Sequence, residues 1–471
     1  MRYISLENGT IWFIITMVIN MLYRKAKKQL IDWLTNSNDA LLVDGARQVG
    51  KSYLIRETLK EQNVDFVEFN FIKQPKLKTI FDSAIAEDAD KFLLELRVAA
   101  KRTLGKNSVV FFDEIQECKE VATAIKFLVE QGQFRYVLSG SLLGVELENI
   151  KSVPTGYLSI IDMYPMDLEE FFIANGLGVD VIEHLKDCFD KRVKVSDMIH
   201  DSLVEATYRY AIVGGMPEAV QKYVDTGDFN EVSKVHKKIY RLYKKDFTKY
   251  ESDPKLRLKL VGTYELIPSE LNSKNKRYTF TNLDKELHFD RYENSFIWLK
   301  KAGVALPTFN STELAVPLEA SKKSNLFKLF ISDVGMLTTM YGNATILKIL
   351  NRDKDINCGS MFENLVAQEL NSHGFDLFYY NNKKHGELDF IIEYKDKVTP
   401  IEVKSGKDYQ NHSALTYFIN SNAFSNAFVL SNYNVEVDDQ ITYLPIYMIM
   451  FIKKNEPLVI KKKLELGKIK L

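Results

Sequence analysis

Residues 40–52 read ALLVDGARQVGKS, and this stretch decides the fold. A short apolar run at 40–43 leads into the pattern GxxxxGK[ST], which extends from Gly45 to Ser52 and is followed by a helical pattern. Gly45 and Gly50 allow a tight turn, so that consecutive backbone amides face phosphate oxygens at the positive end of the helix dipole. A strand, a phosphate-binding loop and a helix in this order predict an α/β P-loop core.

The side chains of this loop have separate tasks. Lys51 would neutralise the β and γ phosphates, and Ser52 would ligate the Mg²⁺ that bridges them. A chance glycine-rich turn before a helix is the alternative, and the complete motif with a strand and a helix on either side disfavours it. ATP with Mg²⁺ is therefore the expected cofactor, and the residues expected to bind it are Gly45, Ala46, Arg47, Gln48, Val49, Gly50, Lys51 and Ser52.

A second apolar run, at 108–112, ends in Asp113 and Glu114. A P-loop core needs a carboxylate on an adjacent buried strand, so we interpret this run as a Walker B pattern. Asp113 would hold Mg²⁺ through water, and Glu114 would polarise the water that attacks the γ-phosphate. An acidic cap between a strand and a helix is the alternative, and the position of the run after the P-loop disfavours it.

A third strand is expected at Arg135–Leu138, and it ends in Ser139, Gly140 and Ser141. A polar side chain at this point of a P-loop sheet can sense the γ-phosphate, which makes Ser139 a candidate cofactor-binding residue. Serine and glycine also end strands for ordinary turn reasons, so both interpretations of Ser139 stay open.

Composition limits the class of protein. The chain has 471 residues, 63 Lys and Arg against 63 Asp and Glu, 46% hydrophobic residues and 3 cysteines. This length favours two to four domains, and the hydrophobic content excludes a disordered chain. Cys118, Cys188 and Cys358 are too few for a disulfide scaffold, so an intracellular, cytoplasmic protein is expected. The zero net charge excludes a globally basic nucleic-acid binder but leaves a local basic face possible.

The N-terminus raises the question of a membrane segment. Residues 11–22 read IWFIITMVINML, which is shorter than the roughly 20 apolar residues of a spanning helix. The flanking residues do not match a signal peptide either. We expect no membrane span, and two alternatives remain. In the first alternative, residues 1–20 form an amphipathic or docking helix. In the second, they are translated from an upstream start, and Met21 is the natural initiator methionine.

The chain after residue 166 divides into three expected regions. Apolar residues at helical spacing predict a helical lid at 167–255. Helices followed by short strands around 304–307 and 315–318 predict a winged helix at 256–345. Basic residues there could contact phosphates without reading sequence, which makes DNA or RNA a candidate partner, while a solvated structural face is the equal alternative. The third region spans 346–471.

The third region carries a second group of candidate catalytic residues. A helix at 361–370 contains Glu363, and a strand entered by Asp389 is followed by a turn near 395–397 and a strand that contains Glu402 and Lys404. A turn centred near residues 396 and 397 would place Asp389 opposite Lys404. Because strand side chains alternate, Asp389, Glu402 and Lys404 would share one face. Two carboxylates around Mg²⁺ with a lysine beside the attacking water would suit phosphodiester cleavage.

This string resembles the PD-(D/E)xK nuclease core, in which Glu363 matches the usual helix acid. The resemblance implies that Asp389, Glu402 and Glu363 are metal ligands and that Lys404 is catalytic. A chance hairpin with these residue types is the alternative, and Pro400 inside the strand suggests a sheet edge or a bulge. Histidines at metal-binding spacing and CxxC pairs do not occur, so the sequence gives no support for a zinc site.

From about Met21 to the C-terminus, the chain resembles the bacterial and archaeal AAA-type ATPases that carry a C-terminal domain of uncharacterised function. The resemblance rests on LLVDGARQVGKSYLI, VVFFDEIQE, VLSGSLLG, the segment 163–172 and later pieces such as 208–220 and 327–337. The resemblance implies ATP binding, ATP hydrolysis and a fused helical, winged-helix and nuclease-like region. One departure concerns Tyr157, which stands where the family commonly has an arginine that contacts phosphate. Either Arg135 or Arg209 replaces that arginine, or hydrolysis is slow.

Together these observations predict an α/β multidomain protein with a P-loop core at 21–166. The expected function is an ATPase that controls a nucleic-acid-associated, nuclease-like module. The alternatives are a slow ATP-dependent switch and a nucleic-acid-binding regulator without nuclease activity. The sequence leaves the oligomeric state open.

Overall fold

The structure is a computed structural model that describes residues 21–84, 89–141, 156–250, 253–273, 276–278, 293–353, 358–421 and 423–454. The chain divides into two compact units. The first comprises Met1–Met163 with Phe172–Gly176, and the second comprises Tyr164–Phe171 with Leu177–Leu471. The predicted extension at 1–20, including the apolar run up to residue 20, lies outside the described residues. The predicted winged helix and nuclease-like region fall within the second unit, and the predicted lid at 167–255 does so apart from residues 172–176. The boundaries between these regions stay predictions.

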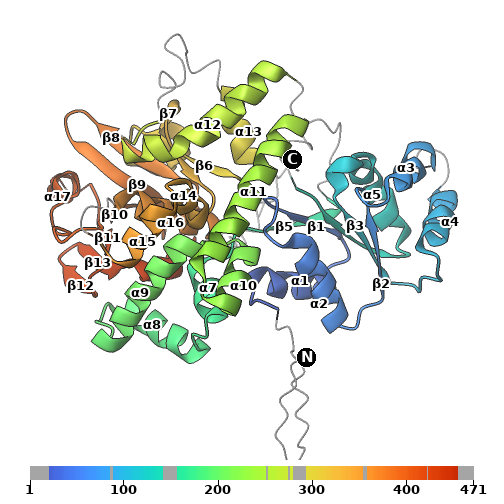
Figure 1. The fold of residues 1–471 in the computed structure, drawn as a ribbon, viewed down its shortest axis with the longest axis horizontal. Helices are drawn as coiled ribbons and strands as arrows, with labels where there is room; N and C mark the ends of the chain where they lie inside the picture. Colours follow the sequence, from blue (N-terminus) through green and yellow to red (C-terminus); the bar gives the residue numbers. More distant parts are fainter. Residues whose placement is uncertain are drawn as a thin grey trace, which may run out of the picture. The chain divides into compact units, whose positions relative to one another are not determined.

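The first unit is built around a parallel five-stranded sheet with the order β2-β3-β4-β1-β5 (Figure 1). Its central strands β3 and β4 are buried except for half-buried Arg135 and are largely apolar, as expected for parallel strands covered on both faces. The rings of Phe112 and Tyr136 stack across neighbouring strands with centroids 6.2 Å apart. The elements are α1 (Lys25–Asn36), β1 (Ala40–Asp44), α2 (Lys51–Glu61), β2 (Phe66–Asn70), α3 (Lys78–Ala84), α4 (Ala89–Ala100), β3 (Val109–Asp113), α5 (Glu120–Gln131), β4 (Arg135–Ser139) and β5 (Leu158–Asp162).

The strand order corrects one expectation about this sheet. The acidic strand β3 is not adjacent to the P-loop strand β1, because β4 lies between them. All three strands are parallel, so their carboxyl ends meet at the same edge. The register pairs Asp113 with Ser139 and Ser139 with Val43. The two predicted parts of the nucleotide site therefore still reach the same edge of the sheet.

The second unit begins with helices, as the periodicity of 167–255 predicts. They are α7 (Leu168–Ala174), whose last three residues belong to the first unit, α8 (Val179–Lys191), α9 (Asp197–Val213), α10 (Pro217–Thr226) and α11 (Phe229–Tyr250). They are followed by α12 (Pro254–Asn272), α13 (Glu293–Lys301), α14 (Val334–Met340) and α15 (Asn343–Leu350). His236 on α11 contacts the carbonyl oxygen of Val213 on α9 at 3.0 Å and Thr339 on α14 at 2.8 Å. This buried imidazole joins three helices.

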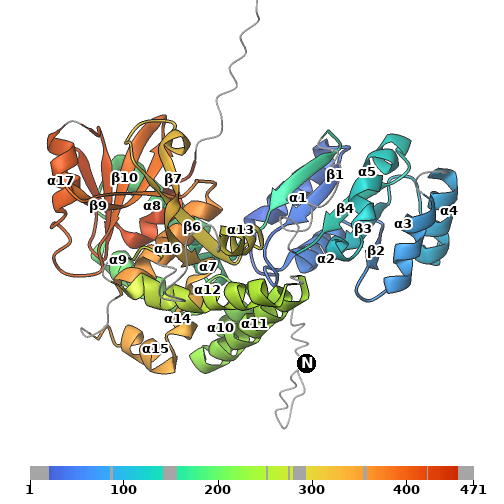
Figure 2. The ribbon, with the colours of Figure 1, turned by 90° about the horizontal axis from the view of Figure 1, so that it is seen from above.

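The other part of the second unit is an eight-stranded mixed sheet with the order β12-β13-β11-β10-β9-β8-β6-β7. Helix α16 (Gly359–Ser372) packs against β6, β7 and β10 (Figure 2). The strands are β6 (Ala305–Ser311), β7 (Lys322–Ile331), β8 (Phe378–Asn382), β9 (Gly386–Tyr394), β10 (Lys397–Val403), β11 (Ala427–Ser431), β12 (Glu436–Asp438) and β13 (Ile441–Pro445). Helix α17 (Ser413–Asn420) connects β10 to β11 along the chain.

The strand predicted at 315–318 is wrong. The partner of β6 is β7, at Lys322–Ile331, and residues 318–321 form a 3₁₀ turn. Pro317 lacks the backbone N–H that a ladder needs, whereas the run that ends in FKLFI buries five consecutive residues. Both β6 and β7 belong to the eight-stranded sheet, so the expected wing contributes strands to the same sheet as the nuclease-like hairpin. A separate winged helix is not confirmed.

Two further expectations concern the membrane and the cysteines. Within the described ranges, no helix combines the length and the apolar character needed to cross a bilayer. Cys118, Cys188 and Cys358 are all free thiols. The prediction that they do not form a disulfide scaffold is confirmed.

Candidate functional site

The P-loop backbone has the conformation that its glycines predict. Gly45 and Gly50 have φ values of 143° and 92°, and Gln48 between them also has a positive φ of 70°. A Cβ atom on Gly45 would lie 2.1 Å from the carbonyl oxygen of Met163, so only glycine fits there. Arg24 on the other side donates a hydrogen bond of 3.1 Å to the carbonyl of Val49. The loop is thus fixed at both ends before α2 begins at Lys51.

The Lys51 ammonium lies inside the loop. Its Nζ donates to the carbonyl oxygens of Gly45 and Ala46, both at 2.7 Å, and to Ser141 Oγ at 3.2 Å. Burial lowers the pKa of Lys51 to about 8, although Asp44 and Glu114 favour its charged form. A charged group held by exchangeable carbonyls at a helix N-terminus is suited to receive phosphate oxygens.

Asp113 is the centre of a second set of contacts at the same sheet edge. Its Oδ1 accepts hydrogen bonds from Ser52 Oγ at 2.6 Å and from Ser139 Oγ. Its Oδ2 accepts one from Asn70 Nδ2 at 2.7 Å. The structure therefore brings together Ser52, Asp113 and Ser139, as the sequence predicts. The hydroxyl and the carboxylate are oxygen donors of the kind that Mg²⁺ prefers, so these residues fit that ion.

Two residues of this site escape the sequence argument. Asn70 ends β2 at the edge where Asp113 and Ser139 end their strands, and a polar residue at that point is the signal that could have indicated it. Gln116 donates from Nε2 to Glu114 Oε2 at 2.5 Å, and its Oε1 accepts from the amide of Ser141 at 3.2 Å. The side-chain carboxamide of Gln116 therefore holds the carboxylate of Glu114, whose backbone has a φ of 62°.

The two arginines considered as replacements for the one absent at Tyr157 are engaged elsewhere. Arg135 donates to the carbonyls of Trp33, Leu34 and Ser37 at 2.7 to 2.9 Å, and its guanidinium lies 4.3 Å from the centre of the Trp33 ring. Arg209 pairs with Glu205 one turn earlier on α9. Arg135 thus satisfies carbonyl groups at the C-terminal end of α1. The contacts of the two arginines give no support to the expectation that either one binds phosphate. Tyr157 donates to Glu130 Oε1 at 2.6 Å.

The second candidate site lies on the β9–β10 hairpin, and its register corrects a prediction. Lys395 and Asp396 form the two-residue turn, with φ values of 52° and 60°, as in a type I′ turn. Ile401 therefore pairs with Phe390, which places Glu402, and not Lys404, opposite Asp389. The predicted turn is centred one residue C-terminal to the observed turn. The predicted partner of each residue on β9 is therefore two residues too far along β10. An even shift preserves the face, so the three side chains still share it.

The predicted residues of the hairpin contact one another. Asp389 Oδ2 accepts from the amide of Val403 at 2.9 Å, and Lys404 Nζ lies 2.8 Å from Glu402 Oε1. Burial, with the neighbouring Asp389 carboxylate, raises the pKa of Glu402 and that of Glu363. We call Glu363, Glu387, Asp389 and Glu402 the acidic centre.

A lysine that the sequence argument missed neutralises this centre. Lys328 on β7 is fully buried, and its Nζ lies 2.6 Å from Glu387, 3.7 Å from Glu363 and 3.9 Å from Asp389. Although burial opposes the charge, the three carboxylates raise the pKa of Lys328, so it stays protonated. Lys276 forms a further ion pair with Glu363. A lysine within the apolar run FKLFI is the signal that could have indicated it.

This arrangement does not fit the predicted metal. Across the described residues, no group of three or more His, Cys, Asp or Glu is placed to hold a metal ion. Glu363 and Asp389 instead face the Lys328 ammonium, and Glu402 pairs with Lys404. The expectation that Glu363, Asp389 and Glu402 bind Mg²⁺ therefore gains no support and stays a prediction, because lysine ammonium groups contact these carboxylates.

Comparison with known families bears on the first unit most directly. Residues 37–172 match a family model described as an AAA domain. This match supports an AAA-type ATP-binding protein. Two other models, both described as domains of unknown function, match residues 204–347 (DUF8612) and 358–449 (DUF4143). No curated protein matches the chain.

Two solved structures show weaker similarity. The Walker-type ATPase PABY2304 of Pyrococcus abyssi is 15% identical, with a TM-score of 0.42, over 69% of this chain and 97% of that one. A structure concerned with katanin self-assembly is 14% identical, with a TM-score of 0.23, over 34% of this chain and 56% of that one. Both scores are below 0.5, so the fold assignment rests on the geometry and on the family match.

Proposed function

We propose that the protein binds ATP with Mg²⁺ in the first unit and hydrolyses it. The observation that carries this proposal is the shared carboxylate of Asp113. This carboxylate accepts hydrogen bonds from the hydroxyl of Ser52 at the start of α2 and from that of Ser139 at the end of β4. Both lie beside the loop that surrounds the Lys51 ammonium. The AAA-domain match over the same residues supports it.

Each residue has a distinct task in this mechanism. The loop amides from Gly45 to Ser52 bind the phosphates, and Lys51 exchanges its contacts with loop carbonyls for contacts with phosphate oxygens. Ser52 and Asp113 would hold Mg²⁺, which neutralises charge on the phosphates when it is bound. Glu114, oriented by Gln116, would accept a proton from the attacking water. Ser139 holds Asp113 and is positioned to sense the γ-phosphate.

Binding and turnover can be tested separately. Lys51→Ala should abolish ATP binding measured by calorimetry, because the buried ammonium is lost. Glu114→Gln should retain binding and lower phosphate release by about 10²- to 10⁴-fold, as expected for a lost general base. Lys60→Ala is the matched control, since Lys60 is exposed on the same helix and, among the described residues, forms its ion pair with half-buried Glu57. Normal ATP uptake by Lys51→Ala would contradict the proposal.

The lysine contacts of the acidic centre favour the two alternatives that lack nuclease activity for the second unit. Because Lys328 occupies the space between Glu363, Glu387 and Asp389, we propose that this unit responds to the nucleotide as a switch or as a nucleic-acid-binding regulator without metal-dependent cleavage. Plasmid, linear and single-stranded substrates incubated with ATP and Mg²⁺ should stay intact. Nicking by the parent protein that Asp389→Ala removes would restore the nuclease hypothesis.

A further inference from the structure

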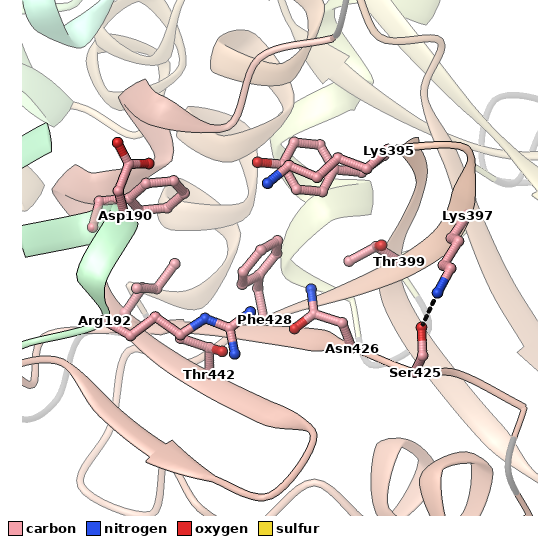
Figure 3. Close-up of a pocket in the computed structure, with 12 residues that line it drawn as sticks. Asp190, Arg192, Lys395, Lys397, Thr399, Ser425, Asn426, Phe428 and Thr442 are labelled. Atoms are coloured by element: carbon pink, nitrogen blue, oxygen red, sulfur yellow. Dashed lines mark hydrogen bonds between the residues drawn. The ribbon is translucent and has the colours of Figure 1, made fainter. Parts of the chain in front are cut away.

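A pocket of about 430 Å³ lies in the second unit, away from the acidic centre. It is formed by the C-terminal end of α8, the turn between β9 and β10, and residues of β10, β11 and β13 (Figure 3). Its volume is within the range of small-molecule sites. Neither the proposed ATPase nor the acidic centre uses any of its residues.

Three cations lie around this pocket without a carboxylate partner in the described structure. The Arg192 guanidinium forms no hydrogen bond or ion pair there, and its backbone amide donates to Phe189 at the end of α8. The Lys395 ammonium lies over the Tyr394 ring at 5.2 Å, and the Lys397 ammonium lies 3.3 Å from Ser425 Oγ. The one lining carboxylate, Asp190, is paired with Lys186 one turn earlier on α8. In a chain with a formal net charge of zero, this is a local excess of positive charge that favours an anion.

The walls of the pocket are aromatic and carry uncommitted polar groups. Phe189, Tyr394 and Phe428 line it, and the rings of Tyr394 and Phe428 meet edge to face with centroids 5.9 Å apart. Thr442 is 1% exposed, and its Oγ1 has no hydrogen-bond partner, which in a native protein calls for an explanation. Figure 3 shows Arg192 extending below the Phe428 ring towards Asn426, so the cation, the ring and the amide converge.

We infer that this pocket binds one nucleotide unit, either free or at the end of a single strand. Arg192, Lys395 and Lys397 would contact the phosphate, because a guanidinium and two ammonium groups match a dianion better than a single carboxylate. The base would lie against the aromatic rings, since stacking suits any base, and Asn426 would hydrogen-bond to it. This inference does not depend on ATP hydrolysis in the first unit.

The test uses the full chain with Lys51→Ala, so that the P-loop does not contribute. The probes are uridine 5′-monophosphate, inorganic phosphate, and a fluorescent pentathymidylate with and without a 5′-phosphate, measured by calorimetry and anisotropy. Arg192→Gln with Lys397→Gln should weaken nucleotide binding by about tenfold or more, because charge-assisted contacts are lost. Lys191→Gln is the matched control, since exposed Lys191 precedes Arg192 and pairs with Asp187.

The outcomes separate the sources of the ligand and can overturn the inference. Tighter binding of the 5′-phosphorylated strand than of the mononucleotide identifies a strand end, and equal binding identifies the nucleotide unit itself. No binding of any probe at millimolar concentration overturns the inference. So does equal affinity for inorganic phosphate and nucleotide, or an affinity that Arg192→Gln with Lys397→Gln leaves unchanged while circular dichroism shows a folded protein.

Discussion

At the scale of single residues, the nucleotide site depends on a lysine whose charge is held in a buried position. Water is excluded from the Lys51 ammonium, and carbonyl oxygens replace it as hydrogen-bond acceptors. This replacement is incomplete, so burial lowers the pKa of Lys51 from its ordinary value of 10.5 to about 8. The residue that is required to attract phosphate therefore titrates just above neutral pH.

This titration predicts a pH dependence of ATP binding. Only protonated Lys51 attracts phosphate, and with a pKa of about 8 its charged fraction falls about tenfold between pH 7 and pH 9. The affinity for ATP should fall by the same factor, measured by calorimetry in buffers of equal ionic strength. Lys51→Arg, which stays charged over this range, is the control, and any binding it retains should not change with pH. A constant affinity of the parent up to pH 10 would contradict this assignment.

Residues that belong to a recognisable motif were predicted well, even where the motifs lie far apart in sequence, and residues outside a motif that join the site only through the fold were not. The P-loop and Asp113 were predictable because each motif carries its own strand and helix signals. Asn70 and Lys328 were missed because each lies on a different strand from the group it contacts, and only strand order brings them together. The contacts of Arg135 with the end of α1 were not anticipated, because its sequence context does not reveal the Trp33 ring.

At the scale of elements, ion pairs between strands and with α16 stabilise the carboxylates of the acidic centre in the eight-stranded sheet. β7 contributes Lys328, β9 contributes Glu387 and Asp389, and α16 contributes Glu363. Removing water from several carboxylates is costly unless an opposite charge lies among them. The predicted register of the β9–β10 hairpin differs from the observed one by two residues. The type of turn determines this register, and the nuclease-like motif does not.

Lys328→Met should therefore destabilise the protein strongly. The substitution keeps an apolar side chain of similar length but leaves buried carboxylates without their shared cation, which costs about 3–5 kcal/mol in comparable cases. Urea unfolding of the parent and the variant would measure the loss. The matched control is Lys323→Met on the same strand, where the lysine is exposed. An equal, small loss in both variants would show that Lys328 does not carry the charge balance.

At the scale of the whole molecule, stability in acid should depend on the helices of the second unit. His236 is fully buried between α9, α11 and α14, and burial lowers its pKa to about 4. In the unfolded chain the same imidazole titrates near 6.5. Between these values the unfolded state binds a proton that the folded state does not, so stability falls as the pH decreases.

The expected loss from this one group is about 3 kcal/mol between pH 7 and pH 4, from about 1.4 kcal/mol for each pKa unit. Chemical denaturation at a series of pH values would measure it. His236→Gln, which keeps a hydrogen-bonding side chain but does not titrate, should show a correspondingly shallower pH dependence than the parent. Parallel pH profiles of the two proteins would exclude His236 as the source of acid sensitivity.

The chain leaves the first unit after Met163 and returns to it for Phe172–Gly176, so neither unit is a single continuous stretch. The intervening residues belong to the second unit, where Leu168 donates from its amide to Glu369 and is fully buried. A gene fusion or recombination event with one breakpoint at this junction would separate buried residues from their own unit. The two units are therefore expected to be inherited together, and grafting the ATPase unit onto another protein would require breakpoints at three junctions, after residues 163, 171 and 176.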